Sequence, residues 1–109
     1  MFRVGGATVL PREVENILLC HPSIVDAVVT STVSRRSRED LECLAYLVTC
    51  GALEASDVLT FMWAESGIPH QVPTGGVVFC QKIPRNDVGK VQKNDLRDVK
   101  VLPGSMMYL

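Results

Sequence analysis

The sequence predicts one small α+β domain over residues 1–109, with a three-stranded, mainly antiparallel sheet, two to three packed helices and an N-terminal hairpin. Its 109 residues are enough for one modest hydrophobic core. Three apolar or β-branched runs alternate with two segments of helical periodicity, which is typical of helices packed on a sheet. A short polar loop joins the first two runs, and this favours antiparallel pairing between them.

The N-terminal hairpin is predicted at Gly5-Gly6, because both glycines can take the positive φ angles that a two-residue turn demands. A helix over about 11–20 follows the hairpin. Pro11 suits the first helical position, and apolar residues then recur at helical spacing. His21-Pro22 makes further helix difficult, so the helix ends there.

The first two strands are predicted over 24–33 and 41–50. The first is rich in β-branched residues and follows a turn, and the second is a largely buried apolar run that Gly51 ends. The polar, charged segment 34–40 between them predicts an exposed loop.

The second helix is predicted over about 57–66, with Ser56 as its N-cap and Gly67 as its stop signal. Leu59, Met62 and Trp63 mark the face expected to pack on the sheet. A third strand is expected over 77–80.

The chain is expected to close with a short helix that Asn94 caps. The tail 101–109 is apolar enough to dock, but a frayed terminus is the expectation, as for most chain ends.

The charge pattern gives no reason to expect a nucleic-acid partner or an anionic membrane surface, since the formal charge is -1 with both signs mixed. We interpret Glu13 and Glu15 as helix-surface residues that gain from the dipole of the first turn. No apolar run approaches the ~20 residues of a membrane span, and no stretch resembles a signal peptide. A cytoplasmic location is the expectation.

The four cysteines indicate reduced, mostly buried thiols, since two of them fall in predicted core strands and nothing else suggests an oxidising compartment. No Cys-x-x-Cys pair occurs, and only two histidines are present, so no metal site is predicted. The four are Cys20, Cys43, Cys50 and Cys80.

The segment 84–97 is the strongest candidate for chemistry, because it combines turn residues with a lysine directly after a glycine. Pro84 fixes one φ angle, Asn86 favours turn geometry, and Gly89 allows a positive φ. Lys90 would sit on a shaped loop tip, where an ammonium can neutralise charge on a carboxylate or phosphate. From the residues alone, a solvated lysine in a surface turn remains the alternative.

Four ordered segments resemble the C-terminal domain of the adenylate-forming enzymes, the acyl-CoA synthetase and luciferase superfamily, and they cover essentially the whole chain. The family's C-terminal signature is matched by Pro84-Arg85-Asn86-x-x-Gly89-Lys90-Val91-Gln92-Lys93-Asn94-x-Leu96-Arg97. The other three matches are 2–15, 21–29 and 68–73. The signature run is most similar to that of malonyl-CoA synthetases.

The resemblance implies a mobile lid domain of an acid–thiol ligase that uses ATP and coenzyme A. Lys90 takes the place of the family's catalytic lysine, which bridges the attacking carboxylate and the nucleotide phosphate during adenylation. After a large rotation, a second face serves thioester formation. Gly5 and Gly6 match the loop that closes over the thiol channel on that face. Arg3 and Thr8 stand where some acyl-CoA ligases contact the nucleotide or the acyl-adenylate with a lysine and a glutamine.

The resemblance also implies a partner, since the family's large N-terminal adenylation domain binds ATP, Mg²⁺ and the carboxylic acid. That domain could act in cis or in trans, and without it we expect no turnover. Acid specificity would lie in that domain. The alternative is a non-enzymatic binding or regulatory module derived from such a lid.

Overall fold

A computed structural model describes residues 2–4, 7–33, 41–51, 53–89, 91, 93–96 and 99–107. The elements are β1 (Phe2–Val4), β2 (Ala7–Val9), α1 (Pro11–Leu18), β3 (Ile24–Val33), β4 (Leu41–Thr49), α2 (Ala55–Glu65), the 3₁₀ turn η1 (Pro69–Gln71), β5 (Gly76–Phe79), α3 (Lys93–Leu96) and β6 (Met106–Met107). The predicted α+β class is confirmed. The segment 34–40, predicted to be a loop, lies outside the described residues.

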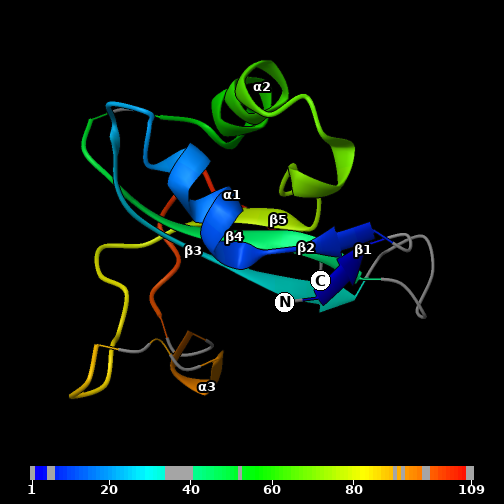
Figure 1. Cartoon of the computed structure of the whole chain (residues 1–109). Coiled ribbons are helices and arrows are strands. Elements are labelled where there is room, and N and C mark those ends of the chain that lie inside the picture. Colours follow the sequence, from blue (N-terminus) through cyan, green and yellow to red (C-terminus); the bar gives the residue numbers. More distant parts are fainter. Residues whose placement is uncertain are drawn as a thin grey trace.

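The main sheet has the strand order β3-β4-β5-β6, and β1 and β2 form a separate hairpin (Figure 1). β3 pairs antiparallel with β4, as predicted, with Val28 opposite Tyr46. β4 pairs parallel with β5, because α2 lies between them in the chain and carries it back across the sheet.

The short strand β6 adds to the predicted three-stranded sheet, and the expectation of a frayed tail is wrong for Met106–Met107. β6 pairs antiparallel with the edge of β5. Two hydrogen bonds hold the chain before β6 next to the end of β5. The Leu102 N–H donates to the Phe79 carbonyl at 2.8 Å, and the Phe79 N–H donates to Ser105 Oγ at 2.9 Å. Tertiary hydrogen bonding of this kind has no local signal in the sequence.

The sheet is buried on both faces, so its strands carry core residues at successive positions. On β4, Ala45 and Leu47 pack in the cluster beneath α1 and α2, whereas Leu44 and Tyr46 pack on the opposite face. Figure 1 shows α1 and α2 on one side of the sheet and α3 on the other. On the second face, the buried side chains of the described residues outside the strands include Cys80, Ile83 and Leu96.

The first helix agrees with its predicted bounds to within two residues, but the start of α2 does not. α2 begins at Ala55, with Glu54 rather than Ser56 as its N-cap. The Glu54 N–H donates to Asp57 Oδ2 at 3.0 Å, which satisfies the reciprocal half of a capping box. Gly67 ends the helix as predicted, with φ +65°.

The buried face of α2 also differs from the prediction. Val58 and Met62 are fully buried with Ala55, and Leu59 packs partly against them, but Trp63 is 49% exposed. Trp63 is one residue beyond Met62, about 100° further around the helix, and this takes its ring off the sheet.

At the C-terminal end, α3 begins at Lys93, so Asn94 lies within the helix and not at the position before it that was predicted for the cap. Within the described part of the chain, no helix is long and apolar enough to cross a membrane.

Candidate functional site

The segment 84–89 forms the shaped turn that the sequence predicts. The Gly89 N–H donates to the Asn86 carbonyl at 2.9 Å, and the Val88 N–H donates to Asn86 Oδ1 at 3.2 Å. Gly89 has φ +81°, a left-handed conformation that other residues rarely adopt. Lys90 follows this turn directly and lies outside the described residues.

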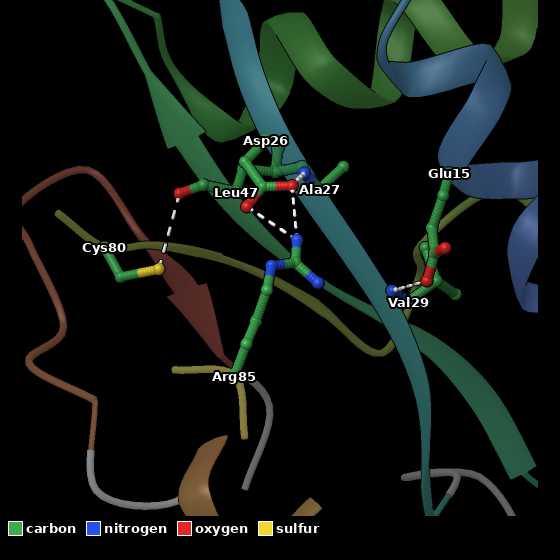
Figure 2. A network of polar contacts seen from close by, with 7 residues as sticks. All are labelled: Glu15, Asp26, Ala27, Val29, Leu47, Cys80 and Arg85. Atoms are coloured by element: carbon green, nitrogen blue, oxygen red, sulfur yellow. Dashed lines mark hydrogen bonds and ion pairs between the residues drawn. The ribbon is translucent and has the colours of Figure 1, made fainter. Parts of the chain in front are cut away.

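An ion pair ties this segment to β3. Arg85 Nη2 donates to both carboxylate oxygens of Asp26, at 2.8 Å to Oδ1 and 2.7 Å to Oδ2 (Figure 2). Asp26 Oδ1 also accepts a hydrogen bond from the Ala27 N–H at 2.9 Å, so both Arg85 and the strand backbone hold the carboxylate. The Arg85 side chain is 40% exposed and the Asp26 side chain is 33% exposed.

Neither member of this ion pair is a predicted site residue. Asp26 is the one charged residue within the apolar strand Ile24–Val33, and this is the signal by which it could have been noticed. Its partner could not have been named, because 59 residues separate the two.

A second carboxylate, Glu15 of α1, also contacts β3; it is half-buried, so its interpretation as a helix-surface residue is only partly right. Its Oε2 accepts the Val29 N–H at 2.9 Å, which joins α1 to the outer edge of β3 (Figure 2). Burial raises the pKa of Glu15, and the Val29 hydrogen bond and the charges of Arg85 and Arg12 oppose that shift. Glu13, by contrast, is exposed in the first turn of α1 as expected.

A cleft of about 440 Å³ lies between α1, β3 and the segment that leads to Lys90. Arg12, Glu15 and Asp26 contribute charged groups to its wall. Arg85 and Val91 also line it, so residues on both sides of Lys90 face the same space. The cleft combines both signs of charge with apolar side chains.

The hairpin brings together two of the predicted site residues. Arg3 and Thr8 are directly opposite each other in the β1–β2 register, and both are exposed. Val4 pairs with Ala7, which leaves Gly5 and Gly6 as the two-residue connection, although both lie outside the described residues. Figure 1 places the hairpin and the segment 84–89 at opposite ends of the sheet.

The cysteines are all free, but only two of them are buried. Cys43 and Cys80 lie in the core, whereas Cys20 and Cys50 are exposed, so the prediction of mostly buried thiols is wrong for the latter pair. Burial raises the pKa of Cys43 to about 12 and also raises the pKa of Cys80. The described residues contain no group of three His, Cys, Asp or Glu that could hold a metal ion.

Comparison with curated proteins finds ligases that act on carboxylic acids. The chain is 31% identical over 105 residues to an acyl-CoA ligase of Emericella nidulans, covering 89% of this chain and 18% of that protein. It is 35% identical over 96 residues to a medium-chain fatty-acid–CoA ligase of Escherichia coli, covering 85% and 16%. It is 32% identical over 97 residues to the mitochondrial malonate–CoA ligase of Bos taurus, covering 88% and 16%. The chain therefore spans less than a fifth of the length of these relatives. No family model matches it.

Comparison with solved structures also finds CoA synthetases among the similar chains. The o-succinylbenzoate–CoA synthetase of Bacillus subtilis, bound to a product analogue, matches 95% of this chain and 20% of its own, with a TM-score of 0.79 and 25% identity. The ATP-bound MatB of Rhodopseudomonas palustris matches 86% and 18%, with a TM-score of 0.74 and 27% identity.

Proposed function

Because the chain matches the C-terminal domain of the adenylate-forming superfamily, whose members include acyl-CoA synthetases and luciferases, we propose that it is the lid domain of an ATP-dependent acyl-CoA synthetase. Such a ligase joins an acid to ATP with loss of pyrophosphate, then passes the acyl group from the adenylate to the thiol of coenzyme A. The observation that carries the proposal is the match of about nine-tenths of this chain to CoA ligases, in sequence and in fold.

Lys90 supplies the charge for the first step. During attack of the carboxylate, negative charge builds on the α-phosphate oxygens, and a preplaced ammonium lowers the energy of that state. No proton transfer is needed, so an ordinary lysine serves. The turn of Asn86 and Gly89 immediately before Lys90 supports this role, since two hydrogen bonds and a left-handed glycine set the backbone that leads to the lysine.

The β1–β2 hairpin supplies the second face. Gly5 and Gly6 let the backbone approach a pantetheine arm closely, and Arg3 and Thr8 contact the nucleotide or the acyl-adenylate. The pairing of Arg3 with Thr8 supports a joint role, because both side chains leave the same exposed surface of the hairpin.

The domain acts only with an N-terminal adenylation domain, in cis or in trans. That partner binds ATP, Mg²⁺ and the acid, and it would occupy the more than four-fifths of the relatives that this chain does not cover. Acid selection belongs to the partner, although the likeness to the malonate–CoA ligase makes a short dicarboxylic acid the first substrate to try. A cytoplasmic setting is supported by the four free cysteines, which a reducing compartment maintains.

The deciding experiment is Lys90→Ala in a ligase that contains this domain. We expect ATP–pyrophosphate exchange to fall by about 10²- to 10³-fold, while thioester formation from supplied acyl-adenylate is retained. Lys93→Ala is the matched control, since it removes the same charge three residues further on and should leave both steps unchanged. Equal loss of both steps in Lys90→Ala would contradict the assignment.

A further inference from the structure

We propose that Arg85 is a positioning residue for adenylation, and that its ion pair with Asp26 holds the segment 84–89, which precedes Lys90 in the chain, against β3. The inference rests on the proposed function, since it concerns the placement of the lysine that acts in that reaction. It adds a role for two residues whose side chains need not touch the substrate.

The geometry fits a clamp between an ordered strand and a turn. One guanidinium nitrogen contacts both oxygens of Asp26, and the Ala27 N–H orients the same carboxylate from the strand side (Figure 2). The register of the β3–β4 pairing shifts between Ile24 and Asp26, so Asp26 is the first residue after an irregularity in the strand. A bulge at this point re-aims a side chain that regular pairing would direct elsewhere. The Asp26 carboxylate is therefore oriented by its own strand as well as by Arg85.

The Arg85–Asp26 ion pair adds a polar contact to a segment that buried apolar side chains hold at its ends. Ile83 and Leu96 are buried at its two ends, and Val91 is partly buried between them. Arg85 lies between the first anchor and the hydrogen-bonded turn that begins at Asn86. With Arg85 fixed, the remaining freedom between the strand and Lys90 is confined to a turn that is itself held by two hydrogen bonds.

An ion pair as exposed as this one contributes little to the stability of a fold, because water screens it. Its effect on catalysis can be larger, since a displacement of about 1 Å at a reacting group can cost about 100-fold in rate. The proposal thus predicts a small effect on unfolding together with a clear effect on adenylation. A purely structural pair would show neither this split nor a preference for one half-reaction.

The first test uses hydrogen exchange in this chain. In Arg85→Gln and in Asp26→Asn, the Gly89 amide should exchange about two to five times faster, while amides in the centre of β4 keep their rates. Arg85→Lys should restore part of the protection, because one ammonium can still reach the carboxylate. Arg12→Gln is the control, since it removes a charge from the same cleft without removing a member of the ion pair. Unchanged Gly89 exchange in both variants would overturn the clamp, whatever Lys90 does.

The second test uses a ligase that contains this domain. Arg85→Gln should lower kcat for ATP–pyrophosphate exchange by about tenfold or more, with KM for ATP unchanged and thioester formation from acyl-adenylate retained. Asp26→Asn should cause a similar loss, and the double variant should lose no more than either single one, because the two act as a unit. Additive losses, or equal damage to both half-reactions, would overturn the inference.

The two proposals fail in different ways. Full activity in Lys90→Ala would refute the role of that lysine, while the Gly89 exchange rates would still decide whether the clamp exists. Loss in Lys90→Ala with full activity in Arg85→Gln would leave the proposed function standing and refute the positioning role.

Discussion

At the scale of single residues, the carboxylate of Glu15 accepts a backbone hydrogen bond at the edge of the sheet, and this makes stability depend on pH. Burial raises its pKa above the ordinary value of 4.5, so the folded state holds the proton more tightly than the unfolded state does. The contribution of Glu15 to stability is therefore fullest below pH 4.5 and is lost as pH rises through the raised pKa. Its neighbours in this titration are Arg85, Arg12 and Asp26.

We expect Glu15→Gln to flatten this pH dependence. The amide oxygen can still accept the Val29 N–H, but it carries no charge to desolvate. Urea unfolding from pH 4 to pH 7 should show the variant gaining free energy of unfolding relative to the parent as the pH rises. Glu13→Gln, at an exposed position on the same helix, should run parallel to the parent. A constant difference for Glu15→Gln across this range would contradict the expectation.

The thiols give a second prediction at this scale. At pH 8, Cys20 and Cys50 should react rapidly with a disulfide reagent, whereas Cys43 and Cys80 should react only on unfolding, since burial keeps both protonated and covered. A stopped-flow titration should count two fast thiols. Cys43→Ser should leave that count at two and Cys20→Ser should reduce it to one; a lower fast count in Cys43→Ser would contradict the burial argument.

Local turn chemistry could be predicted, and long-range pairing could not. Asn86 and Gly89 adopt the turn expected of them because their preferences are set by their own torsions and side chains. The partners of Asp26 and Glu15 depend on which segments the folded chain brings together, and one sequence carries no record of that. For the same reason, the sequence identified Lys90 as a candidate but could not pair Arg85 with Asp26.

At the scale of elements, Gly75 shows how tightly β5 approaches its neighbours. Its N–H donates to the Cys43 carbonyl at 2.8 Å, and an added Cβ would lie 2.7 Å from that same oxygen and 2.5 Å from Thr32 Cγ2. The oxygen belongs to a strand backbone and cannot move freely. Only glycine lets the chain enter β5 at this distance.

We therefore expect Gly75→Ala to destabilise the domain by about 1–3 kcal/mol, as overpacking of a core does. Urea or thermal unfolding measures the loss. Adding Thr32→Ser to Gly75→Ala removes the methyl contact but leaves the carbonyl, so it should recover only a part. A Gly75→Ala variant as stable as its parent would show that the strands can separate locally.

Most element positions followed from the sequence, and the exceptions have physical causes. The strand over 24–33 was predicted with the bounds it has, because β-branched residues bounded by turn signals are a strong pattern. The cap of α2 lies two residues before the predicted Ser56, because Glu54 and Asp57 form a capping box there. The strand β6 was missed, as two residues that pair only through a distant edge carry no periodicity.

At the scale of the whole molecule, the β1–β2 hairpin and the segment 84–89 lie at opposite ends of the sheet (Figure 1). A rigid body of this form can offer one end or the other to a partner domain, and rotation decides which. The proposal of two half-reactions served by two faces requires this separation. Replacing a residue at one end should then affect one half-reaction.

A bulky replacement in the hairpin tests this separation. In a ligase that contains this domain, Gly6→Leu should slow thioester formation from acyl-adenylate more than it slows ATP–pyrophosphate exchange, because the added side chain obstructs the approach to the thiol channel. Val88→Leu is a control at the other end of the sheet, at a side chain that is 84% exposed. Unchanged thioester kinetics in Gly6→Leu would remove the hairpin from the site.

The burial of the sheet on both faces has a further consequence for how this domain can move. The layer with α1 and α2 is thick, and it contains most of the fully buried side chains. On the other face, Val91 and Leu96 line the same cleft as Arg85, whose ion pair with Asp26 ties the segment 84–89 to β3. Breaking an exposed ion pair costs a fold little, and segments held in this way open at lower free energy than the core. Loss of this one pair would therefore let the segment 84–89 rearrange while the remainder of the domain stays folded, so the order of the reacting end depends on a surface contact and not on the core.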